Sequence, residues 1–190
     1  MVVRFGDDAD APARCDRAAR QRIVLDARAL GVPPGYGASR QLRLVREPRA
    51  LACIGEDIHG RRQWLAPRAA RAFLRLQAAA ASDGVAVQVV SAFRSAEYQL
   101  GILRRKLERG QAMPQILQVS AAPGYSEHHS GRALDVTTPG FSPLEEAFER
   151  SPAFAWLEAN AGRFGFALSY PRGNRHGIAY EPWHWCWHAR

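Results

Sequence analysis

The chain has 190 residues, 47% of them hydrophobic, and a formal net charge of +8, which suits one globular domain with a sizeable core. No apolar run approaches the length of a membrane-spanning helix, and the three scattered cysteines lack the spacing of a disulfide scaffold or a thiolate zinc site. The positive charge suits an anionic cell-wall polymer better than nucleic acid, because the sequence contains no nucleic-acid-binding motif.

Residues 1–41 are predicted to be an N-terminal extension, made of one helix and a linker, that packs on the rest of the protein without taking part in chemistry. Asp10 is a candidate N-cap and Pro12 falls in the first turn of this helix, which is expected to end at Leu30. The linker is the stretch 32–37, which is rich in glycine and proline.

Residues 42–190 are predicted to form a single α+β domain, with helices packed against a small, mostly antiparallel sheet. Strands are predicted from alternating or β-branched runs at 41–45, 85–90, 133–136, 164–169 and 180–187. Helices are predicted from capping residues and apolar spacing at 67–83, 96–109 and 152–162, with a further helix starting at 142. The stretch 110–122 is expected to be irregular.

Two segments concentrate side chains that bind metals or transfer protons. A catalytic zinc site needs three protein ligands, an open position for water and a base that takes the proton of that water. The first segment, SEHHSGRALD, offers His128 and Asp135, and the second, EPWH, offers Glu181 and His184. Together they supply two imidazoles and two carboxylates, which is enough for three ligands and a base.

The carboxylate of Asp135 is expected on the wet face of a strand. Alternation places it opposite the aliphatic side chains of Leu134 and Val136. Gly131 allows a tight bend, so that His128 can fold back towards Asp135. The alternative for Asp135 is a buried aspartate with satisfied hydrogen bonds and no metal.

Glu181 and His184 can share a site only if the chain departs from a regular strand. Strict alternation would place the two side chains on opposite faces. A bend or bulge at Pro182 or Trp183 would bring them together, and proline favours such an irregularity. We therefore predict a break in the strand at this point.

The order of three motifs resembles a known family. The pattern Ser-x-His-x-x-Gly-x-Ala-x-Asp starting at Ser126, followed downstream by Glu-Pro-Trp-His, is similar to the D-alanyl-D-alanine carboxypeptidases related to VanY, within the LAS-type zinc peptidases. Upstream, the segment 91–99 resembles the Ser-x-x-Arg-Ser-x-x-x-Gln segment of that family. The resemblance runs from about residue 42 to the C-terminus.

The resemblance implies a zinc ion held by His128, Asp135 and His184, with Glu181 as the base that activates water. It also selects His128 over its neighbour His129. Because adjacent side chains in an extended segment point in opposite directions, His129 is expected to support the site from behind or to lie on the surface.

A carboxypeptidase must also recognise the free carboxylate at the end of its substrate. The planar fork of donors on arginine suits this task, and Arg94 is the candidate because of its place in the family-like segment. Gln99 and Ser126 match family positions that help to hold the substrate. The alternative for Arg94 is a surface salt bridge.

The leading hypothesis is a zinc-dependent D,D-carboxypeptidase that hydrolyses the terminal D-Ala-D-Ala bond of peptidoglycan stem peptides. Two enzymatic alternatives stay open, an L,D-carboxypeptidase acting on tetrapeptide stems and a D-Ala-D-Ala dipeptidase. A cell-wall-binding module that has lost turnover is the non-enzymatic alternative.

The predicted partner is a peptidoglycan stem peptide or muropeptide, with no nucleic acid and no integral membrane segment, and no oligomeric state is predicted. The family resemblance implies the periplasm or cell envelope. The first ten residues lack the apolar core of a secretory signal, so the cytoplasm is the alternative compartment.

Overall fold

The computed structural model describes residue 12 and residues 16–189, and within this part the protein has the predicted α+β architecture. The helices are α1 (Arg17–Ala29), α2 (Tyr36–Ser39), α3 (Pro67–Ser82), α4 (Ala96–Glu108), α5 (Met113–Gln118) and α6 (Pro152–Asn160). The strands are β1 (Ala52–Glu56), β2 (Arg62–Leu65), β3 (Gln88–Ser91), β4 (Ala133–Thr137), β5 (Phe166–Leu168) and β6 (His184–Trp187). Single 3-10 turns form η1 (Glu127–Ser130), η2 (Glu146–Arg150) and η3 (Ala161–Phe164).

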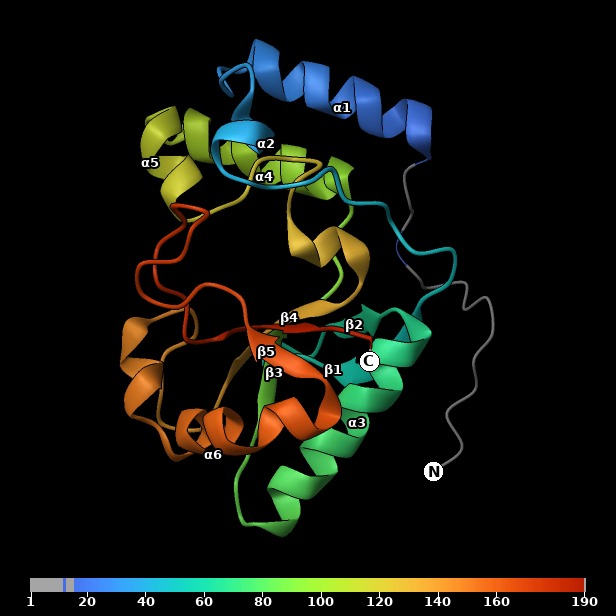
Figure 1. Cartoon of the computed structure of the whole chain (residues 1–190), viewed down its shortest axis with the longest axis vertical. Helices are drawn as coiled ribbons and strands as arrows, with labels where there is room; N and C mark the ends of the chain where they lie inside the picture. The colour runs from blue at the N-terminus through green and yellow to red at the C-terminus, as the bar shows by residue number, and fades with distance from the viewer. Residues whose placement is uncertain (1–11, 13–15, 190) are drawn as a thin grey trace.

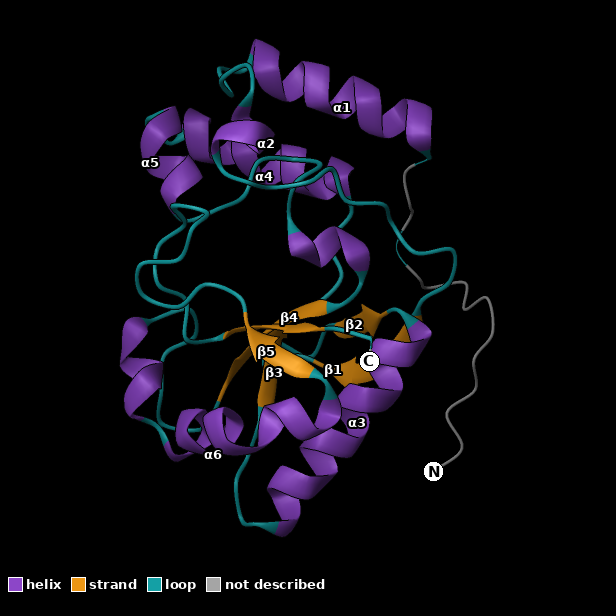
Figure 2. Ribbon diagram, in the orientation of Figure 1, coloured by secondary structure: helices purple, strands orange, loops and turns teal. Residues whose placement is uncertain are grey.

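The strands form two antiparallel sheets (Figure 2). The larger sheet has the order β3-β4-β6-β5, and β1 and β2 form a separate hairpin. Strand β4 therefore lies inside the larger sheet, paired on both edges. The predicted small antiparallel sheet is confirmed.

The two largest hydrophobic clusters among the described residues lie on either side of this sheet (Figure 1). Helices α3 and α6 pack on one face of the sheet, where Leu134 and Val136 of β4 join the core that contains Phe73. On the other side α1, α2, α4 and α5 pack on one another through a second core that includes Ile23 and Leu100. None of the helices in the described part of the chain is long and apolar enough to cross a membrane.

The N-terminal helix begins later than the sequence predicts. Its N-cap is Asp16, whose carboxylate accepts a hydrogen bond from the backbone N–H of Ala19 at 2.7 Å. Pro12 is not helical, and Asp10 lies outside the described residues. The predicted end is correct, because Leu30 is the C-cap.

Three other local predictions are wrong. Residues 41–45 form no strand, since Gln41 has a φ of +52° and the segment joins the fold through irregular contacts. The stretch 110–122 contains helix α5, which buries two apolar side chains against α4. No helix starts at 142, because Leu144 has a φ of +60°, and helical structure resumes only as the short turn η2.

The serines directly before the predicted helices at 96–109 and 152–162 are their N-caps. Ser95 accepts a hydrogen bond from the N–H of Tyr98 at 3.1 Å and starts α4. Ser151 accepts one from the N–H of Phe154 at 3.0 Å and starts α6. The cap at Ser95 matters for function, because it fixes the end of the strand-to-helix segment that carries Arg94.

Candidate active site

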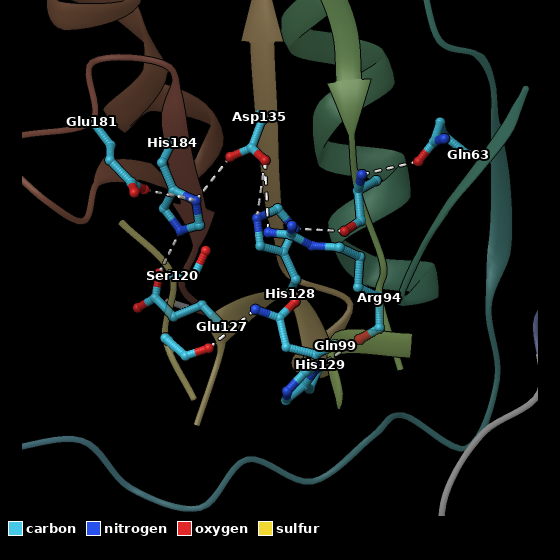
Figure 3. A network of polar contacts seen from close by, with 12 residues as sticks. Gln63, Arg94, Gln99, Ser120, Glu127, His128, His129, Asp135, Glu181 and His184 are labelled. Carbon is cyan, nitrogen blue, oxygen red and sulfur yellow. Dashed lines mark hydrogen bonds and ion pairs between the residues drawn. The ribbon is translucent and has the colours of Figure 1, made fainter. Parts of the chain in front are cut away.

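Three potential metal ligands come together beside the paired strands β4 and β6. His128, Asp135 and His184 are buried, and each offers a ligand atom that lies within 4.8 Å of the other two. Antiparallel pairing of β4 with β6 sets Asp135 directly opposite His184. The turn η1 brings His128 to the same place (Figure 3).

Gly131 makes the bend between η1 and β4, as its type predicts. Its φ is +63°, in the left-handed region that L side chains rarely adopt. A Cβ at this position would lie 2.8 Å from the backbone nitrogen of Ala66, which itself donates a hydrogen bond to the Gly131 carbonyl. The bend therefore requires glycine for two reasons: its left-handed backbone conformation and the close approach of the Ala66 backbone.

The ring of His128 is held in one tautomer. The carbonyl oxygen of Ala92 can only accept, so the Nδ1 atom 2.6 Å from it carries the hydrogen. The other nitrogen, Nε2, then faces Oδ2 of Asp135 at 3.2 Å with a lone pair and has no hydrogen-bond partner. Burial and the charge of Arg94 lower the pKa of His128 to about 4, so this ring is neutral at neutral pH.

The ring of His184 lies between two carboxylates. Its Nδ1 is 3.0 Å from Oδ1 of Asp135, and its Nε2 is 3.0 Å from Oε2 of Glu127. Burial lowers the pKa of His184, but these two carboxylates outweigh burial and raise it to about 10. The environment of this ring therefore favours positive charge.

These observations fit a divalent metal ion. The unpartnered Nε2 of His128 and the carboxylate of Asp135 are both acceptors, and a cation between them would satisfy both. Burial raises the pKa of Asp135, but the neighbouring imidazoles hold it well below its usual range, so its carboxylate is available as a ligand. Two imidazoles and one carboxylate are a donor set that catalytic zinc sites use.

Glu181 reaches the site because the strand is broken where the sequence predicts. Pro182 and Trp183 form a turn that is closed by a hydrogen bond from the His184 N–H to the Glu181 carbonyl at 3.1 Å, and β6 starts only at His184. The Glu181 carboxylate then lies 3.9 Å from Nδ1 of His184. Burial raises the pKa of Glu181 to about 7, which suits a group that accepts and returns a proton at neutral pH.

The metal-ligand group opens into a cleft of about 550 Å³ between the sheet and helix α4. Arg94 lines this cleft, with its Nη2 atom 3.8 Å from Oδ2 of Asp135 and its Nε without a partner. The predicted neighbours Gln99 and Ser126 are both buried and line the same cleft. Gln99 donates from Nε2 to the Ala121 carbonyl at 3.0 Å, whereas its Oε1 has no partner.

A second cavity, of about 770 Å³, shares Arg94 with this cleft and is lined by basic and aromatic side chains from α1, β2 and α4. No histidine lines it. The larger cavity therefore does not contain the metal-ligand group. The smaller cleft is the candidate active site because the potential metal ligands line it.

His129 has a structural task, which is one of the two roles predicted for it. Residues 127–130 form the turn η1 and not an extended segment, so alternation does not apply. The ring of His129 is fully buried, with Nδ1 2.7 Å from the Arg94 carbonyl and Nε2 accepting from the Gly124 N–H at 3.1 Å. It supports the backbone of Arg94 from behind, and the surface position expected as an alternative is wrong.

Lys106 was not predicted from the sequence to belong to the site. Its ammonium group lines the cleft and donates to the Ser120 hydroxyl at 2.9 Å. Burial lowers its pKa, the charge of Arg94 lowers it further, and Glu181 opposes both. The available signal was its position seven residues after Gln99, which puts both side chains on the same face of a helix.

Residues 62–190 match the family model of VanY, D-alanyl-D-alanine carboxypeptidase. The D-alanyl-D-alanine carboxypeptidase of Enterococcus faecalis is 32% identical over 117 residues, which cover 56% of this chain and 42% of that protein. That of Enterococcus faecium is 49% identical over 63 residues, or 32% of this chain and 19% of that protein. The chain thus spans less than half the length of these curated relatives.

Solved structures agree with this match. The LdcB LD-carboxypeptidase aligns with a TM-score of 0.67 and 29% identity over 74% of this chain and 69% of that chain. A mutant of VanY, a vancomycin-resistance D,D-pentapeptidase solved in complex with Zn(II), aligns with a TM-score of 0.57 and 27% identity over 78% of this chain and 88% of that chain.

Proposed function

Because the chain belongs to the VanY family of D-alanyl-D-alanine carboxypeptidases, we propose that it is a zinc-dependent D,D-carboxypeptidase that removes the terminal D-alanine from peptidoglycan stem peptides. One observation carries the proposal: a single cleft joins the buried group of metal ligands and the carboxylate of Glu181 to the guanidinium group of Arg94. A metal site, a base and an anion-binding side chain are what cleavage beside a free C-terminus requires.

In this proposal His128, Asp135 and His184 hold the zinc ion. A zinc ion held there would supply a Lewis acid for the scissile carbonyl and would lower the pKa of a bound water to about 7. The protein fixes the two imidazoles by hydrogen bonds at the nitrogens that do not face Asp135. Burial of all three side chains keeps bulk water away from the reacting atoms.

Glu181 acts as general base and then as general acid. Its carboxylate takes a proton from the water whose oxygen attacks the carbonyl carbon of the penultimate residue. It then delivers that proton to the amine nitrogen of the departing D-alanine as the carbon–nitrogen bond breaks. A pKa of about 7 lets the same group perform both transfers near neutral pH.

Arg94 binds the C-terminal carboxylate of the substrate, with Gln99 and Ser126 beside it. Its Nε carries a hydrogen without a partner in the protein, which leaves a donor for an incoming anion. We include Lys106 in this subsite, because its ammonium lies in the same cleft and the charge of Arg94 lowers its pKa. Two cations in one cleft favour an anionic group over an uncharged one.

An L,D-carboxypeptidase acting on tetrapeptide stems is the second candidate, supported by the alignment with LdcB. Mass spectrometry of the products from pentapeptide and tetrapeptide muropeptides separates the two. We expect the zinc-loaded protein to remove one alanine from the pentapeptide only, and a chelator to abolish this. Removal of an alanine from the tetrapeptide would assign L,D-carboxypeptidase activity. If the zinc-loaded protein cleaved neither substrate, both carboxypeptidase candidates would be contradicted, and D-alanyl-D-alanine would be the next substrate to test.

A further inference from the structure

We propose that Glu127, a residue without an assigned role, positions the metal ligand His184 by accepting the hydrogen of its Nε2. The inference deepens the proposed function, because it rests on His184 as a ligand. The Oε2 atom of Glu127 lies 3.0 Å from Nε2, and Nδ1 lies 3.0 Å from Asp135 on the opposite edge of the ring. A neutral imidazole with its hydrogen on Nε2 has its lone pair on Nδ1, facing the other ligands.

The backbone presents Glu127 to this ring in a defined way. Glu127 starts the turn η1, and the hydroxyl of Ser130 donates to its carbonyl at 2.6 Å, which closes the turn. His128 follows it directly in the chain, so one turn delivers both a ligand and the partner of a second ligand. The side chain of Glu127 is 29% exposed, so its contact with the buried ring is only partly screened by water.

The other imidazole of the site shows the same arrangement, with a different kind of acceptor. The Nδ1 hydrogen of His128 is accepted by the Ala92 carbonyl, and the Ala92 N–H in turn donates to Oε1 of Gln63 at 2.9 Å (Figure 3). Metal-binding histidines commonly donate their second N–H to a carbonyl or carboxylate, which fixes the tautomer and the ring orientation. Of the two acceptors here, only Glu127 is a side chain and can be exchanged by mutation.

The position of Glu127 argues for a positioning role and against direct action on the substrate. It contacts the edge of the His184 ring that faces away from Asp135, whereas Glu181 lies 3.9 Å from the edge that faces the ligands. A proton carrier must reach the attacking water, and Glu181 is on the correct side for this. The two glutamates therefore flank one imidazole with separate tasks.

The first test measures the zinc affinity of the folded, metal-free protein by competition with a chromophoric chelator. We expect Glu127→Ala to bind zinc about 10- to 100-fold more weakly than the wild type. Glu127→Gln should retain most of the affinity, because its amide oxygen still accepts from Nε2. Glu158→Ala, which removes an exposed glutamate from α6, serves as the matched control and should leave the affinity unchanged.

A zinc affinity of Glu127→Ala equal to that of the wild type would overturn the proposal. A Glu127→Gln protein that binds zinc as weakly as Glu127→Ala would also overturn it, because the charge of Glu127 and not its hydrogen bond would then determine the affinity.

Proton–nitrogen NMR of the zinc-loaded wild type gives a second test that needs no variant. We expect His184 to bind zinc through Nδ1 and to show a hydrogen-bonded Nε2–H, and binding through Nε2 would contradict the inference. Neither measurement uses a peptide substrate, so an inactive wild type would refute the proposed function without deciding this question.

Discussion

Asp135 and His184 face each other across the paired strands β4 and β6, with Oδ1 of the carboxylate 3.0 Å from Nδ1 of the imidazole. The contact joins residues 49 positions apart in the chain. It places a carboxylate with a low pKa beside an imidazole with a raised one, in a buried setting. The register of β4 against β6 thus sets the electrostatic environment of these two candidate metal ligands.

Exchange of Glu181 separates metal binding from turnover. We expect Glu181→Ala to retain zinc, because this carboxylate is not among the three ligand atoms, and to lose about 10²- to 10⁴-fold in kcat. His184→Ala should lose both zinc and turnover. Zinc content by elemental analysis and hydrolysis of a pentapeptide check this, and a Glu181→Ala protein with wild-type kcat would remove Glu181 from the mechanism.

Arg94→Ala should weaken recognition of free-carboxylate substrates. Loss of a charged hydrogen bond costs about 1.5–3 kcal/mol, which corresponds to a kcat/KM lower by about 10- to 100-fold. The matched control is Arg104→Ala, which removes an exposed arginine from α4, the helix that follows Arg94. Steady-state kinetics on peptides with a free C-terminus measure the effect, and equal kcat/KM in wild type and Arg94→Ala would place Arg94 outside the substrate site.

Lys106→Met should act mainly on KM. The ammonium is half-buried in the cleft and does not contact the metal ligands, so we expect KM for a pentapeptide to rise about fivefold, equivalent to about 1 kcal/mol, with little change in kcat. The rise should shrink at high ionic strength, because the attraction is electrostatic. A KM that does not change at low salt would show that Lys106 takes no part in substrate binding.

Asp57 is a buried carboxylate outside the active site that should make stability depend on pH. It accepts hydrogen bonds from the Arg61 backbone and guanidinium, the His59 N–H and the Gln63 amide. Burial raises the pKa of Asp57, but these donors outweigh burial and lower it below its ordinary value. The unfolded chain therefore takes up a proton first as the pH falls, so the stabilisation is complete above the unfolded pKa of about 4 and is lost as the pH falls through the folded one.

We accordingly expect Asp57→Asn to reduce the free energy of unfolding by about 2 kcal/mol at pH 7. The difference from the wild type should stay constant between about pH 5 and 7 and shrink below about pH 4. Denaturant titrations over this range measure it. A difference that grows on acidification would contradict the assignment of Asp57 as a stabilising carboxylate.

Much of the candidate site could be predicted from sequence, because local rules decide it. Alternation along β4 puts Asp135 opposite its aliphatic neighbours, and Gly131 is one of the few residues able to make the preceding bend. Proline at 182 marks the break that brings Glu181 to His184. Each of these features depends on residues within a few positions of one another.

The rest was decided by tertiary structure. Residues 41–45 alternate like a strand but find no strand to pair with, and α5 forms in a stretch with weak signals because α4 offers it an apolar surface. In the sequence Glu127 is recognisable only as the residue before the predicted ligand His128. Its hydrogen-bond partner His184 is 57 residues away in the chain. Such contacts depend on strand register and helix packing between segments that are far apart in the chain. The sequence motifs therefore identify the residues of the site, whereas only the tertiary structure determines which of them contact one another.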